Sequence, residues 1–269
     1  MVSLGAKVAL SIIAVELFLA LLAGFIAPHP YDKIDLGKRL EPPSPSHILG
    51  TDPLGRDVFS RLVYALRTTI TISAVSLGAA LIVGTLLGII SAILGGLVDT
   101  TLLGVFSVMY AIPGLFIAVA VLLIMGSGAV GTATAITITL APMFFRLSRA
   151  GAREVLAKQY VEAAKALGAS TLRIALNYVG RELVAVVIPT AIYMLSDAIA
   201  LEATFSVIGL GIPPPTPSLG NMVAEYKDYI LAAPWLAAIP VVVVALTIAS
   251  LNTLAKELAR EFSIVTEVA

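Results

Sequence analysis

One uncharged stretch decides the fold class of this chain: residues 68–98 read TTITISAVSLGAALIVGTLLGIISAILGGLV. No formal charge occurs in the 31 residues between Arg67 and Asp99. A helix of about 20 residues crosses the apolar core of a bilayer, so this stretch is long enough for one crossing. It therefore predicts a membrane-spanning helix.

Two other uncharged stretches extend this prediction to the whole chain. There are 46 residues without formal charge between Asp99 and Arg146, enough for two spans, and 27 between Asp228 and Lys256, enough for one. Of the 269 residues, 59% are hydrophobic and 13% are charged, about half the charged share of ordinary globular domains. The sequence predicts an all-α, polytopic membrane protein that lies in the lipid bilayer of the cell membrane.

Charge and cysteine content exclude several other classes of function. The net charge is zero, which gives no reason to expect nucleic acid as a partner. The chain has no cysteine, so disulfide frameworks and thiolate metal sites are excluded.

We expect six spans, in three parts of the chain. The parts are an N-terminal anchor helix (1–27), an external segment (28–68) and a core transmembrane domain (69–269). The first apolar stretch is longer than the core of a signal peptide, about 7–15 residues, so we expect it to be retained. Small residues at Gly84 and Gly88 would let a second helix approach the second span closely. The spans are predicted at 8–27, within 69–98, and at 102–125, 132–147, 183–207 and 234–254.

The basic residues predict the orientation. Residues 146–182 carry seven Lys or Arg against three Asp or Glu, the strongest positive bias in the chain. Loops rich in Lys and Arg stay in the cytoplasm. We therefore expect 146–182 to be cytoplasmic and 28–68 to be external, and with six spans both termini are cytoplasmic.

The cytoplasmic loop contains a compact helical segment, residues 160–168, with the sequence YVEAAKALG. Tyr160, Ala163, Ala164 and Leu167 recur at the spacing of one helix face. Gly168 is suited to end the helix, since glycine adopts the left-handed cap conformation. Ser170 is a plausible N-cap for a following helix at 171–179. From this pattern alone, the short helix either packs on its own protein or docks a partner.

Three motifs resemble one transporter family. Glu162-Ala163-Ala164 followed by Gly168 resembles the "EAA" loop of the membrane subunits of ABC importers. Residues 50–62 (GTDPLGRDVFSRL) and 202–222 (EATFSVIGLGIPPPTPSLGNM) resemble the second membrane subunit of dipeptide, oligopeptide and nickel importers. The resemblance covers about residues 45–252. The chain departs from the family at Tyr178 and Arg181, where His and Pro are usual, and in its tail, 256–269.

The resemblance implies a type I ABC importer fold and a permease subunit that forms half of a translocation path for peptides or a similar small solute. It implies four kinds of contact: a homologous permease subunit in a heterodimer, two ATP-binding subunits, an extracellular solute-binding protein and lipid. ATP and Mg²⁺ would bind the partner subunits, because this chain has no Gly-x-x-x-x-Gly-Lys phosphate loop. The resemblance assigns coupling to the motif residues Glu162, Ala163, Ala164 and Gly168. Tyr160 and Leu167 complete the same helix face and are included with them.

Other functions stay open at this point. The same architecture could import oligosaccharides or nickel. A secondary transporter would need inverted repeats and ionisable coupling sites at mid-membrane, and an intramembrane enzyme would need paired catalytic side chains. Neither pattern is evident, and the sequence suggests no catalytic residues.

A few polar residues within the expected spans are candidates for a path. A charge near the bilayer centre costs at least about 2.5–3.5 kcal/mol, so it normally faces protein or water. Asp197 is the better candidate for the wall of the path, although it could also pair with an Arg of a partner. Glu202 either lines the path or accepts hydrogen bonds from the backbone after Ser206. Glu16 is more typical of a subunit contact.

Two features of the expected external segments remain. His29 and His47 are interpreted as solvated loop residues rather than metal ligands, and no metal site is expected. Four prolines in 212–217 favour a stiff segment, either a platform for a docking protein or only a rigid connection.

Overall fold

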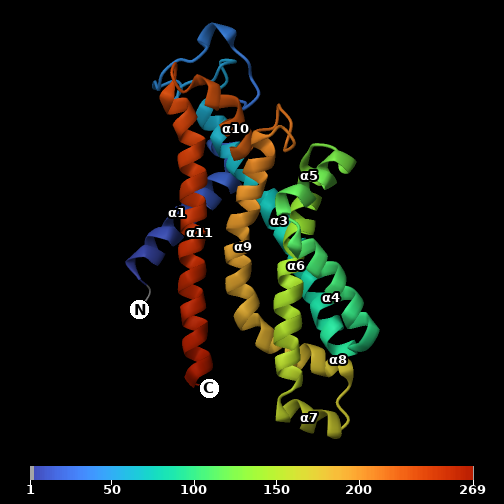
Figure 1. The fold of residues 1–269 in the computed structure, drawn as a ribbon. Coiled ribbons are helices and arrows are strands. Elements are labelled where there is room, and N and C mark those ends of the chain that lie inside the picture. Colours follow the sequence, from blue (N-terminus) through green and yellow to red (C-terminus); the bar gives the residue numbers. More distant parts are fainter. Residues whose placement is uncertain (1–2, 269) are drawn as a thin grey trace.

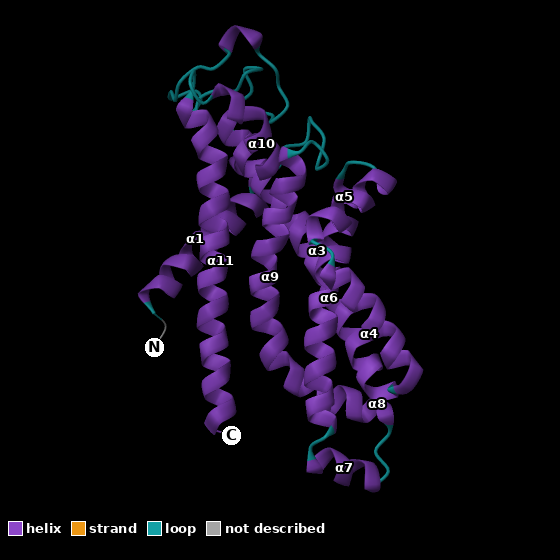
Figure 2. Ribbon diagram, viewed as in Figure 1, coloured by secondary structure: helices purple, strands orange, loops and turns teal. Residues whose placement is uncertain are grey.

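The protein is described by a computed structural model over residues 3–268, with side chains for residues 3–260. Figure 2 shows helices and loops, and no strand, over this part of the chain. Long helices run side by side along the molecule, with the short helix α7 at one end and the 28–57 loop at the other (Figure 1). In chain order the elements are α1 (Leu4–Leu21), α2 (Ala23–Ile26), η1 (Leu36–Lys38), α3 (Val58–Leu94), α4 (Gly96–Ala111), α5 (Gly114–Met125), α6 (Ala129–Leu156), α7 (Gln159–Ala166), α8 (Thr171–Ile174), η2 (Ala175–Gly180), α9 (Arg181–Val207), α10 (Leu219–Tyr226), η3 (Lys227–Tyr229) and α11 (Pro234–Val268).

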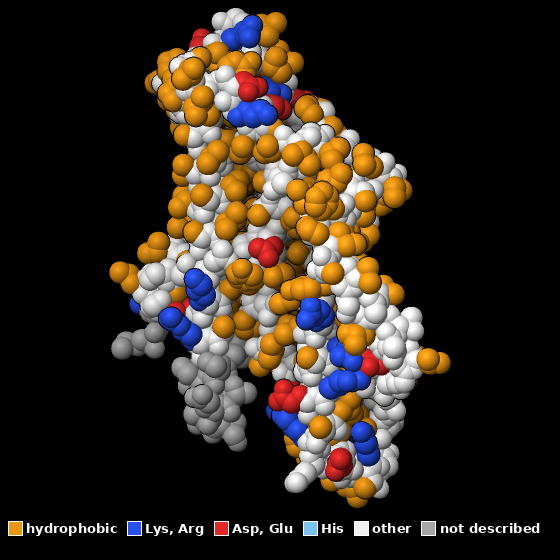
Figure 3. All heavy atoms as spheres, in the orientation of Figure 1, with side chains coloured by type: hydrophobic (Ala, Val, Ile, Leu, Met, Phe, Trp, Pro, Cys, Tyr) orange, Lys and Arg blue, Asp and Glu red, His pale blue; other side chains and the backbone are white. Residues whose placement is uncertain are grey.

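Five helical segments of the described residues are long and apolar enough to cross a membrane. They are α1, α3, α6, the segment 171–207 that ends with α9, and α11. Charged side chains gather at the two ends of the visible face, and hydrophobic side chains form the broad band between them (Figure 3). The all-helical, multi-span fold predicted from the sequence is confirmed.

The third predicted span, 102–125, is wrong as one continuous helix. The chain instead forms α4 and α5, which are bent by 98° at the break and together make the sixth candidate span. Pro113 has no N–H and restricts the preceding residue, and Ile112 is extended (φ −82°, ψ 128°). The 12 residues of α5 reach only about 18 Å, too short to cross a bilayer alone.

The helix containing the second span begins earlier than the predicted span. α3 starts at Val58, inside the expected external segment, because the Asp57 side chain caps it by accepting a hydrogen bond from the Ser60 N–H at 2.8 Å. The segment expected to be external is therefore shorter than predicted and ends at Asp57. α11 likewise extends well past Leu254.

α3 and α6 make the most extensive helix–helix contact in the fold. A Cβ placed on Gly84 would lie 2.6 Å from the carbonyl oxygen of Ala141, and one on Gly88 would lie 2.7 Å from that of Phe145. Two glycines one turn apart thus let the backbones touch, as their spacing predicts. The Phe106 and Phe145 rings stack nearby with centroids 4.2 Å apart, which brings α4 onto the same core.

A buried ion cluster joins the 28–57 loop end to α10. Arg56 contacts Asp52 at 2.6 Å and Glu225 at 2.7 Å, while Arg61 contacts Glu225 at 2.8 Å and the Tyr226 hydroxyl at 3.1 Å. Arg61 has no exposed surface. These arginines belong to the 50–62 motif, so that motif holds together the end of the molecule opposite α7.

Candidate functional site

The short helix predicted within residues 146–182 is present. α6 runs on to Leu156, and α7 (Gln159–Ala166) begins and ends one residue before the predicted 160–167. Gly168 has φ +84°, the left-handed conformation that favours glycine. The Ser170 side chain caps α8 by accepting from the Arg173 N–H. α7 lies beyond the ends of the long helices in Figure 1.

The predicted contact face of α7 is divided between two environments. Val161 packs in a small core with residues of α6, α8, η2 and α9, and Ala164 is also buried. Ala163 and Leu167 are exposed, Leu167 at 89%. Ala164 therefore contacts its own chain, and the exposed surface of α7 is offset from the predicted face toward Glu162 and Ala163.

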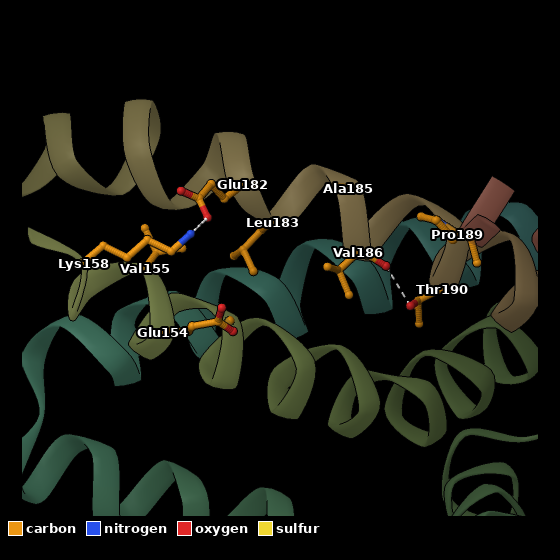
Figure 4. Close-up of a pocket in the computed structure, with 11 residues that line it drawn as sticks. Glu154, Val155, Lys158, Glu182, Leu183, Ala185, Val186, Pro189 and Thr190 are labelled. Carbon is orange, nitrogen blue, oxygen red and sulfur yellow. Dashed lines mark hydrogen bonds and ion pairs between the residues drawn. The ribbon is translucent and has the colours of Figure 1, made fainter. Parts of the chain in front are cut away.

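A polar contact at its first turn holds α7 against α9. Lys158 Nζ lies 2.5 Å from Glu182 Oε2 (Figure 4). The Tyr160 hydroxyl donates to the other oxygen of the same carboxylate. The hydrogen bond to Glu182 raises the pKa of Lys158 above its usual range. The Tyr160 ring also stacks on Tyr178, with centroids 5.9 Å apart.

Sequence reasoning missed this contact because Lys158 and Glu182 are 24 residues apart and share no helix. Tyr178, noted as a departure from the family pattern, has a structural role in it. A cavity of about 410 Å³ lies beside the pair, lined by Val155, Leu183 and Pro189 among others. Figure 4 draws the residues that line it.

A second ion cluster links α3, α4 and α6 near the same end. Asp99, at the start of α4, lies 2.6 Å from Arg149 Nε and 2.5 Å from Arg153 Nη2. The Ser91 hydroxyl donates to the same carboxylate at 2.6 Å. The helix that leads into α7 is thereby tied to the break between α3 and α4.

Asp197 lies midway along α9 and is half-buried. It lines a cavity of about 300 Å³ together with Thr139 and Thr204. No ion pair or hydrogen bond of its carboxylate occurs within the described residues. This placement suits the wall of a polar path.

Glu202, by contrast, has no exposed surface. It accepts hydrogen bonds from Thr69 at 3.0 Å and from Ser206 at 2.9 Å. Thr69 in turn accepts from the Leu219 N–H at 3.0 Å. Glu202 therefore joins α3, α9 and α10, which supports the structural role weighed for it rather than a place on a path.

Glu16 is also engaged within the chain. Its side chain is 7% exposed and accepts a hydrogen bond from Thr247 at 2.9 Å, which links α1 to α11. In this fold Glu16 is a contact between two helices of one subunit.

Comparison with known families gives two matches. Residues 84–263 match the family described as "Binding-protein-dependent transport system inner membrane component". Residues 5–43 match the "N-terminal TM domain of oligopeptide transport permease C".

Similar proteins span nearly the same length. The chain is 35% identical over 241 residues to the di/tripeptide transport system permease protein of Pseudomonas aeruginosa, covering 87% of this chain and 80% of that protein. It is 34% identical to the probable D,D-dipeptide transport system permease protein of Escherichia coli, covering 90% and 81%. It is 32% identical to the dipeptide permease protein of Haemophilus influenzae, covering 92% and 86%.

A solved structure shares the fold. A chain of the MetNI methionine ABC transporter, in an inward-facing conformation, superposes with a TM-score of 0.60 at 16% identity, covering 74% of this chain and 95% of that chain. The resemblance inferred from the motifs is confirmed by these matches.

Proposed function

The chain belongs to the family of binding-protein-dependent transport system inner membrane components, and on that premise we propose that it forms half of the translocation path of an ATP-driven importer of short peptides. Support for the substrate class comes from the relatives, whose names specify dipeptides, tripeptides, peptides or glutathione at 29–35% identity. Glutathione is itself a tripeptide, so one class of cargo accounts for all of these names.

The observation that carries the coupling role is the two-sided environment of α7. Val161 anchors one face in the protein's own core, Ala164 on that face is buried, and Glu182 holds the first turn. The opposite face, with Glu162 and Ala163, has no cover from the described residues. One face of α7 is packed on its own chain and the other is exposed. A partner that binds the exposed face and moves α7 would therefore also move α6 and α9.

The proposed assembly follows from that role. Two ATP-binding subunits, which hold ATP and Mg²⁺, would dock on α7 and its counterpart in a homologous permease subunit. The α7 end would then be cytoplasmic, with both termini on that side of the membrane. The Ser3 N–H donates to Glu257 at 2.9 Å, so the start of α1 lies beside α11, which supports placing both termini on one side of the membrane. A solute-binding protein would dock at the opposite end, where Pro213 to Thr216 are exposed.

Asp197 is the residue of this chain that we place on the path. Asp197 lines a cavity between α6 and α9 together with Thr139 and Thr204. A peptide carries an α-ammonium group, and an unpaired carboxylate offers it the opposite charge. Glu202 contributes to the path only indirectly, by fixing the outer ends of α3 and α9.

Ala163→Glu tests the coupling role. The side chain is exposed, so the larger, charged replacement leaves the core around Ala164 undisturbed. We expect the complex to lose its ATP-binding subunits on purification, and transport to fall, while the chain still inserts and melts like wild type. Ala232→Glu makes the same change at an exposed position of the opposite end and should keep the ATP-binding subunits. If Ala163→Glu retains them in full ratio and transports normally, the assignment of α7 is wrong.

A further inference from the structure

The two histidines of the chain lie next to each other at the outer end of the fold. His29 follows α2 and His47 lies in the loop before α3, with ring centroids 4.9 Å apart. His47 is only 7% exposed, so the expectation of two solvated loop histidines is wrong for it. They are the only histidines in the sequence, and there is no cysteine.

The hydrogen bonds set which nitrogen of each ring carries the proton. His47 Nδ1 lies 2.9 Å from Asp57 Oδ1, and His29 Nε2 lies 3.1 Å from the Ser46 carbonyl oxygen. A carboxylate and a carbonyl accept hydrogen bonds, so both of these nitrogens donate. A neutral imidazole has one N–H, which leaves lone pairs on His47 Nε2 and His29 Nδ1.

Asp57 is placed as the carboxylate that orients a metal-binding histidine. Histidine ligands typically donate their second N–H to a carboxylate, which sets the tautomer and makes the ring a better ligand. Asp57 is itself immobilised, since its other oxygen accepts from the Ser60 N–H at the start of α3. Its position thus comes from the helix cap rather than from any ion.

The spacing and the surroundings suit a small cation. Ligand atoms of His29, His47 and Asp57 all lie within 4.8 Å of one another. Zinc–nitrogen bonds of about 2.0–2.1 Å place two ligand nitrogens no more than about 4 Å apart, so a separation at the upper end of this range would have to shorten on binding. The three residues line a cavity of about 100 Å³. Lys33 and Lys38 also line it, and the Asp35 and Asp57 carboxylates balance their charge.

We propose that His29 and His47, with Asp57 beside them, bind a divalent transition-metal ion of the zinc type at the outer end of α3. Imidazole nitrogen suits zinc, copper and nickel, whereas Mg²⁺ and Ca²⁺ prefer oxygen ligands. The ion would join the exit of the N-terminal helix to the start of α3, where the His29 N–H already donates to Ser60 Oγ at 3.2 Å. It is a structural clamp, independent of the proposed coupling and path.

The binding test uses the full chain with its partner subunits, purified in detergent through an affinity tag that contains no histidine. After chelation and dialysis, ZnCl₂ is titrated by calorimetry, and bound metal is counted by mass spectrometry after desalting. We expect one equivalent of zinc attributable to this chain, unaffected by millimolar Mg²⁺ or Ca²⁺, and a higher melting temperature with zinc present. Zinc X-ray absorption should show imidazole scattering. No retained zinc, or a shell of oxygen ligands alone, would overturn the proposal.

Three variants assign the binding to these residues. His29→Gln keeps an amide that can donate to the Ser46 carbonyl, and it should weaken zinc binding at least about tenfold. Asp57→Asn keeps a side chain that can cap α3, and it should weaken zinc binding about 10–100-fold. Lys33→Gln is the control, because Lys33 lines the same cavity but is not a proposed ligand. The zinc affinity of this variant should equal or exceed that of wild type. If His29→Gln melts like wild type without metal and binds zinc equally tightly, the site is not here.

Discussion

Gly84→Ala should force apart the two most closely packed helices of the molecule. The added methyl carbon would lie 2.6 Å from the Ala141 carbonyl oxygen, 2.7 Å from Phe144 Cβ and 2.9 Å from the Phe145 nitrogen. These atoms belong to the backbone or are fixed to it, so none can rotate away. Ordinary contact begins at 3.4 Å, and α3 and α6 must therefore separate locally by about 0.8 Å.

Gly78→Ala is the reference variant against which the loss of stability in Gly84→Ala is measured. Both glycines lie within α3, so both substitutions gain the same helix propensity, about 1 kcal/mol. A Cβ on Gly78 meets nothing within 4 Å. The difference between the two variants is then the overpacking term alone, about 1–3 kcal/mol. At about 2–4 °C per kcal/mol, Gly84→Ala should melt about 2–12 °C below Gly78→Ala.

The assay is thermal unfolding of the purified full chain with its partners in one detergent. Gly88→Ala, whose Cβ would lie 2.7 Å from the Phe145 carbonyl oxygen, should behave like Gly84→Ala. If Gly84→Ala melts at or above Gly78→Ala, the close backbone contact between α3 and α6 does not exist in the protein.

Three further predictions test the path, the orientation and the anchoring of α7. Asp197→Asn should assemble and melt as well as wild type, since no ion pair within the described residues is broken and a charge is removed from a partly dehydrated site; transport assays should show an altered rate or peptide range, and wild-type transport would remove Asp197 from the path. Single cysteines can be placed at Ser170 and Thr216, which are both exposed. In right-side-out vesicles the cysteine at 170 should not react with an impermeant thiol reagent, whereas the cysteine at 216 should react. The reverse pattern would invert the topology. Glu182→Gln should change the free energy of unfolding by only about 0–1 kcal/mol, because the ion pair with Lys158 is partly exposed. It should nevertheless speed amide hydrogen exchange across residues 159–168. Unchanged exchange would mean that Glu182 does not hold α7.

Much of the candidate site was predictable because its signals are local. The order of the motifs identified the family, and Gly168 and Ser170 marked the end of α7 and the start of α8 by their cap preferences. The face that α7 turns inward was not predictable in this way. Val161 and Ala164 are buried because α6, η2 and α9 pack on that side, and the period of a single short helix does not contain this information.

The sequence alone was enough to locate most of the membrane-spanning segments, since apolar length is a property of consecutive residues and the bilayer thickness sets the required number. The break at Pro113 was not predicted, because 102–125 is uncharged throughout, and only the folded chain shows the 98° bend between α4 and α5. Tertiary structure alone paired Lys158 with Glu182, enclosed Glu202 among Thr69 and Ser206, and brought His29 beside His47. In these cases residues far apart in the chain meet only after the helices have packed, because burial and hydrogen bonding depend on the distances between elements.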